Sequence, residues 1–192
     1  AANPDHAEAL VGKARVRRYF RDPKNAEAFL NKAIRLYPQW TLPLSERARI
    51  YREEGFLREA LADLDTANEL DKQDYWLALD RGNVLMDLGR NDQALEEFDR
   101  AINLDPDQFL AYVYSAGLRD AAGAYEEAER DYKQLARLKP EYYFAFEALG
   151  VLYMRDGRFN DARDAFLEAY TYAPQHYDYA LLASINWIRG DR

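Results

Sequence analysis

Proline recurs in this chain on a grid of 34 residues, interrupted only by Lys72, and no other feature constrains the fold as strongly. The prolines on this grid are Pro4, Pro38, Pro106, Pro140 and Pro174. Two further series keep the same step. The glycine series is Gly55, Gly89, Gly123 and Gly157, and the alanine series is Ala26, Ala60, Ala94, Ala128 and Ala162. Three residue types in one register indicate a chain built from a structural repeat of 34 residues.

Each series has a physical role in a repeat of two helices. Proline cannot continue a helix, so it suits the junction that closes each repeat. Glycine in the middle of a repeat supplies the left-handed residue that ends a first helix. Alanine early in the second helix lets two helices approach closely, and the position facing it in the first helix is small throughout: Ala14, Ala48, Gly82, Ala116, Gly150 and Ser184. The next turn of the second helix carries the large apolar residues Leu30, Leu64, Phe98, Tyr132 and Phe166.

The pattern resembles the tetratricopeptide repeat (TPR) family over essentially the whole chain. The residues that carry the resemblance most clearly are Arg81, Gly82, Gly89, Ala94, Phe98, Ala101, Leu104, Asp105 and Pro106, and again Leu149, Gly150, Tyr153, Gly157, Ala162, Phe166, Ala169 and Pro174. The resemblance implies an all-α fold, a right-handed superhelical solenoid of antiparallel helix pairs with about 11 helices.

The repeats predict a single array over residues 1–192. Five complete repeats span about 7–38, 41–72, 75–106, 109–140 and 143–174, and a final helix spans 177–189. The chain starts inside the junction motif Asn3-Pro4-Asp5 and stops within a sixth repeat, so we expect a fragment of a longer protein.

The first repeat departs from the glycine series. Arg21 stands where the glycine belongs, and Asp22-Pro23 follows, which suits an N-cap with proline at the first helical position. We therefore expect a differently shaped turn in this repeat.

Composition excludes several classes of function. Hydrophobic residues make up 48% of the chain and charged residues 31%, and no window approaches the roughly 18 uninterrupted apolar residues of a membrane span. The sequence shows no signal peptide. Cysteine is absent, which excludes a thiol nucleophile and zinc–thiolate sites. The net charge of −8 argues against a nucleic-acid partner, because phosphate contacts need a basic surface.

The sequence offers no catalytic constellation. His6 and His176 occupy equivalent turn positions five repeats apart, so they cannot meet in a solenoid. Phosphate-binding, metalloprotease, nucleophile-elbow and EF-hand motifs do not occur. The prediction is therefore a protein that is not an enzyme and that needs no cofactor or metal.

In the TPR family, fixed positions of each first helix point into a concave groove. The resemblance places thirteen residues there as candidate partner-binding residues: Arg15, Arg18, Arg49, Arg52, Trp76, Leu79, Asn83, Met86, Leu110, Val113, Phe144, Val151 and Met154. The same positions also carry Gly117, Asp120 and Glu147. The groove thus has arginines in its first two repeats and apolar side chains further on.

Two interpretations of these residues stay open. Apolar side chains on a face that the core does not need are typical of an interaction surface, but neighbouring helices or a terminal segment could also cover them. The arginines could hold acidic groups of a ligand, or they could pair with Glu46, Glu53 and Glu54.

The leading functional hypothesis is a scaffold that binds a protein or a peptide with an acidic part and an apolar part. One alternative is a regulatory or targeting region of a larger enzyme whose catalytic domain lies elsewhere. Another is a module for self-assembly through the exposed ends of the array.

Overall fold

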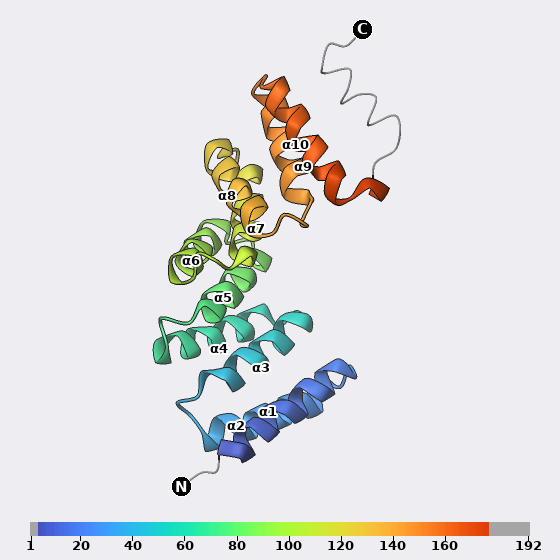
Figure 1. The fold of residues 1–192 in the computed structure, drawn as a ribbon. Coiled ribbons are helices and arrows are strands. Elements are labelled where there is room, and N and C mark those ends of the chain that lie inside the picture. The colour runs from blue at the N-terminus through green and yellow to red at the C-terminus, as the bar shows by residue number, and fades with distance from the viewer. Residues whose placement is uncertain (1–3, 177–192) are drawn as a thin grey trace. The chain divides into compact units, whose positions relative to one another are not determined.

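A computed structural model describes residues 4–176, and all regular elements in that range are helices (Figure 1). They are α1 (Pro4–Tyr19), α2 (Pro23–Leu36), α3 (Thr41–Glu53), α4 (Leu57–Leu70), α5 (Tyr75–Asp87), α6 (Asn91–Leu104), α7 (Phe109–Ala121), α8 (Tyr125–Leu138), α9 (Phe144–Arg155), α10 (Phe159–Tyr172) and the short 3₁₀-helix η1 (Pro174–His176). Each predicted repeat contains one pair of these helices. The predicted final helix, 177–189, lies outside the described residues.

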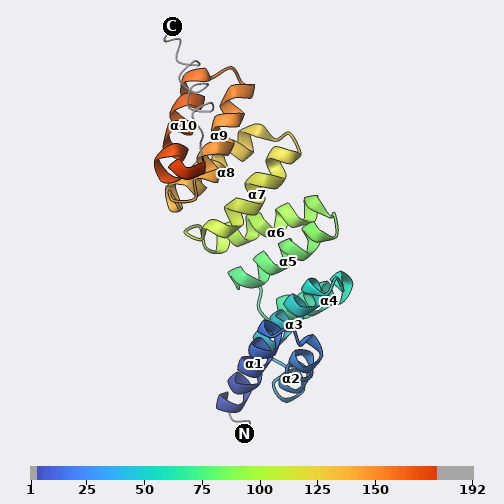
Figure 2. The same cartoon turned by 90° about the vertical axis from the view of Figure 1, so that its right-hand side faces the viewer.

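The helices belong to two compact units, an N-terminal unit over Ala1–Asp105 and a C-terminal unit over Pro106–Arg192. In the N-terminal unit the pairs are α1/α2, α3/α4 and α5/α6; α2 also packs against α3, α4 against α5, and α3 contacts both α1 and α5. In the C-terminal unit the pairs are α7/α8 and α9/α10, and α8 also packs against α9 (Figure 2). The pairs confirm the predicted all-α fold of consecutive helix pairs.

The turn inside the first repeat has the same shape as the glycine turns, so the expectation of a different turn is wrong. Arg21 has a φ of 55°, in the left-handed region where Gly55 has 82°. Asp22 N donates to Arg17 O over 2.9 Å, as Phe56 N donates to Tyr51 O over 2.7 Å. These hydrogen bonds fix the left-handed conformation, and the exposed Arg21 adopts it in spite of its Cβ.

The N-cap predicted for the second helix of the first repeat is confirmed. The Asp22 side chain accepts a hydrogen bond from Asn25 N over 3.4 Å, and Pro23 begins α2. A second bond, from the Asn25 side-chain amide to Asp22, measures 2.8 Å and lowers the pKa of the Asp22 carboxyl.

In the third and fifth repeats, a glycine on the first helix lies directly against a phenylalanine ring on the second. A Cβ placed on Gly82 would lie 2.5 Å from the Phe98 ring, and one on Gly150 would lie 2.6 Å from the Phe166 ring. Where the large residue is the smaller leucine, as at Leu64, the facing residue is alanine, and both are buried. The two rings therefore require glycine opposite them.

Arginines tie consecutive repeats of the N-terminal unit together. Arg47 on α3 forms an ion pair of 2.6 Å with Asp63 on α4 and donates to Asn31 on α2. Arg81 on α5 repeats the arrangement, with Asp65 on α4 at 2.8 Å and with Glu97 on α6. Each arginine thus joins the second helix of its own repeat to the second helix of the repeat before it.

Candidate functional site

The thirteen predicted groove residues all lie on the first helices α1, α3, α5, α7 and α9, and the structure exposes them to different degrees. The exposed ones are Arg15, Trp76, Phe144, Val151 and Met154. Half-buried ones are Arg18, Arg49, Arg52, Met86, Leu110 and Val113. In each unit the exposed and half-buried residues form a candidate surface, which we call the first-helix face of that unit.

For two of the thirteen residues, Leu79 and Asn83, the prediction of an exposed groove position is wrong. Leu79 and Asn83 are only 3% and 5% exposed, because α3, α4 and α6 all pack against α5. They belong to the interior and offer a partner almost no surface. The Asn83 Oδ1 atom finds no hydrogen-bond partner among the residues that the structure describes.

The arginines of the first-helix face form a ladder of ion pairs between successive first helices. In one row, Arg15 reaches Glu46 at 2.7 Å and Arg49 reaches Asp80 at 2.8 Å. Both arginines thus reach from one first helix to a carboxylate on the next.

A second row lies further along these helices, with its arginines one turn and its carboxylates two turns beyond those of the first row. Arg52 reaches Asp87 at 2.5 Å, and Arg18 lies 3.8 Å from Glu53. In the C-terminal unit the same row has its charges reversed, since Asp120 on α7 accepts from Arg155 on α9 over 2.8 Å. We call these contacts the arginine ladder.

Glu46 is the centre of the ladder in the N-terminal unit. Its side chain is 3% exposed and is surrounded by three guanidinium groups, Arg15 at 2.7 Å, Arg49 at 3.1 Å and Arg18 at 3.3 Å. A buried carboxylate is tolerated only when positive charge and hydrogen bonds compensate it, and the three arginines do so. Of the two interpretations left open for the arginines, pairing within the protein is thus observed with Glu46 and Glu53, whereas pairing with Glu54 stays a prediction.

Asp80 and Arg49, which pair in the ladder, influence each other's pKa. Burial raises the pKa of the Asp80 carboxyl, and the positive charge of Arg49 opposes that rise only in part. On the partner side, burial works against the charge of Arg49, yet the Asp80 carboxylate leaves the Arg49 pKa raised. Each of the four arginines has a carboxylate partner, so their charge is largely balanced within the protein.

Two hollows lie along the first-helix face of the N-terminal unit. One, of about 340 Å³, brings Arg15 and Arg49 together with Trp76. The other, of about 400 Å³, brings Arg18, Arg49 and Arg52 together. Arg18, Arg49 and Arg52 thus share one pocket, and Arg49 also shares the other pocket with Arg15 and Trp76.

Trp76 is held in place by the start of its helix. The Asp74 carboxylate caps α5 by accepting from Trp76 N over 2.7 Å and from Leu77 N over 3.3 Å. The Tyr75 ring contacts the indole edge-to-face at 5.0 Å, yet 47% of Trp76 stays exposed. A large aromatic side chain is therefore fixed at its base and open to solvent on its face.

The C-terminal unit has an apolar pocket of about 350 Å³ on its first-helix face, which we call the α9 pocket. Its lining residues are Asp120, Tyr132, Phe144, Glu147, Ala148, Val151 and Phe166. Burial, with the nearby Asp120 charge second, raises the pKa of Tyr132 to about 12, so its phenol stays neutral. The pocket thus has aromatic and aliphatic walls and two carboxylates.

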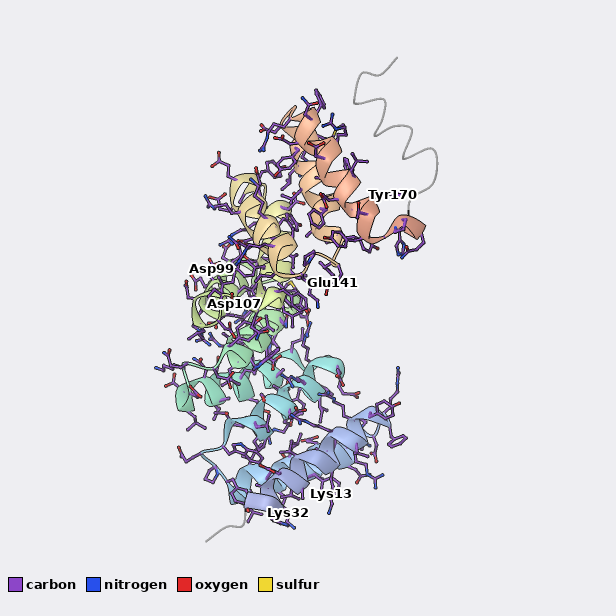
Figure 3. All side chains as sticks on the ribbon, viewed as in Figure 1. Lys13, Lys32, Asp99, Asp107, Glu141 and Tyr170 are labelled. Atoms are coloured by element: carbon purple, nitrogen blue, oxygen red, sulfur yellow. The ribbon has the colours of Figure 1, made fainter. Side chains whose placement is uncertain are left out.

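Sequence reasoning missed an apolar surface on the outer side of the α1–α2 pair, the side on which Lys13 and Lys32 project in Figure 3. A hollow of about 550 Å³ there is lined by Gly12, Lys13, Val16, Arg17, Phe20 and Phe29. Val16 is 55% exposed, whereas Ile50, one repeat later, is 3% exposed. The sequence does contain a signal for this surface: Val16 is an apolar residue at the position that Ile50 occupies in the core of the next repeat.

Among residues 4–176, no group of three or more His, Asp or Glu side chains is placed to hold a metal ion. In the same range, no helix combines the length and the apolar character that crossing a membrane requires.

Comparison with protein-family models identifies the repeats. A model described as "Tetratricopeptide repeat" matches residues 7–39, a second with the same description matches residues 107–177, and a model described as "TPR repeat" matches residues 82–114. No curated protein matches the chain significantly.

Several solved structures share the fold. MamA from Desulfovibrio magneticus RS-1 is 17% identical, with 91% of this chain and 98% of that chain covered and a TM-score of 0.76. YrrB, described as a TPR protein with an unusual peptide-binding site, is 20% identical over 92% of this chain and 90% of its own, with a TM-score of 0.72. PilW, described as a widely conserved type IV pilus biogenesis factor, is 21% identical over 99% and 88%, with a TM-score of 0.75.

Proposed function

The chain belongs to the tetratricopeptide repeat family, and from this premise we propose that it is a non-catalytic scaffold that binds a peptide or a helix of a partner protein on its first-helix face. TPR proteins generally serve as protein-interaction scaffolds, and the peptide-binding site of YrrB is a precedent within the same fold.

One observation carries the proposal: half-exposed aromatic side chains stand beside pockets on the first helices of both units. Trp76 and Phe144 are each 47% exposed and each lines a pocket. A monomeric protein has little reason to keep large rigid rings in such a position, whereas binding surfaces use them as anchors. Val151 and Met154, 44% and 38% exposed, extend the apolar surface around Phe144.

The arginine ladder limits which arginine can contact an acidic part of the partner. Three of the four arginines are two-thirds covered and engage carboxylates of the protein itself. Arg15 is the exception in exposure, since 51% of its side chain faces solvent beside the Trp76 pocket. We therefore expect an acidic partner residue to bind at Arg15, next to the anchor that fills the Trp76 pocket.

Selection from a random peptide library tests the proposal, followed by titration calorimetry of the selected peptides. Trp76→Ala or Phe144→Ala should weaken binding about 30-fold, the usual effect of losing an aromatic anchor. Phe159→Ala is the matched control, because Phe159 is 51% exposed but begins the second helix α10. Unchanged binding in both Trp76→Ala and Phe144→Ala would overturn the proposal, and so would an equal loss of binding in Phe159→Ala.

The outer surface of the α1–α2 pair favours a second candidate function, self-assembly. Val16 and Phe20 are 55% and 70% exposed there. Association through this surface predicts a mass in sedimentation equilibrium that rises with concentration and returns to the monomer value in Val16→Ser/Phe20→Ser. A monomer at all concentrations in the unaltered chain would eliminate this candidate.

A further inference from the structure

The α9 pocket lies where the arginine ladder has a gap. Positions equivalent to Arg15 and Arg49 are occupied by Gly117 on α7, and positions equivalent to Glu46 and Asp80 by Ala148 on α9. In the N-terminal unit each such pair fills the space between two first helices with an arginine and a carboxylate. In the C-terminal unit both side chains are missing; Ala148 lines the α9 pocket, as does Asp120, which lies one turn after Gly117 on α7.

The space at Gly117 is open. A Cβ placed there would meet no atom of the described residues within 4 Å. The second row of the ladder is present beside it, because Asp120 pairs with Arg155 at 2.8 Å. Within the C-terminal unit the gap is therefore limited to one rung, and α7 and α9 remain joined by the other.

The walls of the pocket are suited to one kind of side chain. The side chains of Phe144, Phe166 and Val151 provide an apolar surface. Glu147 and Asp120 also line the pocket, and its lining, as far as the structure describes it, includes no basic residue. A long aliphatic stem with a positive charge at its end would match both parts, since such side chains pack their methylenes on apolar surface and keep their charge near carboxylates and ring faces.

We propose that the α9 pocket binds an arginine or lysine side chain of the partner peptide, which takes the place of the missing rung. The inference rests on the proposed function and adds the chemistry of one anchor to it. Arg49 supplies the internal precedent, because it extends from α3 to the Asp80 carboxylate on the next first helix, α5, and also pairs with Glu46 on its own helix. The incoming cation would meet the Glu147 carboxylate in the same way, with its stem against Phe144 and Val151.

Four capped pentapeptides test the chemistry directly: acetyl-Ala-Ala-X-Ala-Ala-amide with X as arginine, citrulline, norleucine or glutamate. Citrulline keeps the shape of arginine without its charge, and norleucine keeps only an apolar stem. Titration followed by amide chemical shifts in the isotope-labelled chain should show arginine binding about fivefold more tightly than citrulline. The shifts should centre on α9. Equal or tighter binding of norleucine would overturn the proposal and make the pocket an apolar anchor site.

Substitution of Gly117 gives an independent test. Gly117→Arg supplies the missing side chain from the protein itself, so it should compete with the arginine peptide and weaken its binding at least tenfold. Gly117→Ala is the matched control, because it gains the same helix propensity and leaves the pocket open. Binding that survives in Gly117→Arg as well as in Gly117→Ala would overturn the proposal.

The outcomes separate this inference from the proposed function. Library peptides that bind the first-helix face without a basic residue would leave the scaffold function intact and overturn the cationic anchor. A library that yields no peptide sensitive to Trp76→Ala or Phe144→Ala would overturn the scaffold function itself, whatever the capped pentapeptides do.

Discussion

The contact between Gly82 and Phe98 gives a quantitative test of how the repeats pack. In Gly82→Ala the new Cβ would lie 2.5 Å from the ring, about 1 Å closer than an ordinary contact. Such overpacking costs typically 1–3 kcal/mol, and the better helix propensity of alanine returns about 1 kcal/mol. We expect the free energy of unfolding to fall by about 1 kcal/mol.

The neighbouring repeat shows how to relieve the clash. Ala48 faces Leu64 there, and both side chains are buried, so alanine is accommodated opposite a leucine. Phe98→Leu alone leaves a gap opposite Gly82 and should cost about 1–2 kcal/mol. In the double variant Gly82→Ala/Phe98→Leu, the added methyl group fills that gap and the clash disappears. The two changes should therefore interact favourably by about 1–2 kcal/mol.

Urea denaturation of the four proteins, followed by circular dichroism, measures this double-mutant cycle. The double variant should be more stable than the sum of the single changes predicts. Strict additivity, or a Gly82→Ala variant more stable than the unaltered chain, would refute the steric argument. In either case Gly82 would owe its place to something other than the Phe98 ring.

Three further predictions concern the turns and the ladder. Arg21→Gly should raise the free energy of unfolding by about 1 kcal/mol, because it removes the Cβ from a left-handed residue whose side chain is exposed. A loss of stability in urea denaturation would contradict this prediction. Glu46→Gln should lower the free energy of unfolding by about 2 kcal/mol, since three arginines lose their shared charge partner. In the control Glu69→Gln, where 76% of the side chain is exposed, the free energy of unfolding should change by less than about 0.5 kcal/mol. Because burial raises the pKa of Asp80 above 3.8, the folded state holds this proton more tightly than the unfolded chain, so the contribution of Asp80 to stability falls as pH rises through the folded pKa. As the pH rises above 3.8, the unaltered chain should therefore show a more negative slope of stability against pH than Asp80→Asn, and equal slopes would contradict this prediction.

The fold was largely predictable because its determinants repeat within the sequence. Glycine after each first helix and the small–large pair inside each repeat are local requirements, and they recur in one register. Arg21 shows where such reasoning fails: a missing glycine suggested a different turn, but the hydrogen bonds of the turn impose its conformation on whichever residue stands there.

The candidate site was predictable only in part, because its properties depend on pairs of residues in different repeats. Sequence position placed Arg49 on the first-helix face, but only the structure shows that it engages Glu46 and Asp80 together. Burial of Leu79 likewise depends on the helices packed around α5, which a position within the repeat does not reveal. Likewise, Gly117 can be recognised as a missing rung only by comparison with the ion pairs that Arg15 and Arg49 form at the equivalent positions.

The binding of peptide to the first-helix face is the central claim, and amide chemical-shift mapping of the isotope-labelled chain with a library-selected peptide tests it most directly. The account predicts that the perturbed amides lie in α1, α3, α5, α7 and α9, with the largest changes near Trp76 and Phe144. Perturbations confined to the second helices α2, α4, α6, α8 and α10 would contradict it.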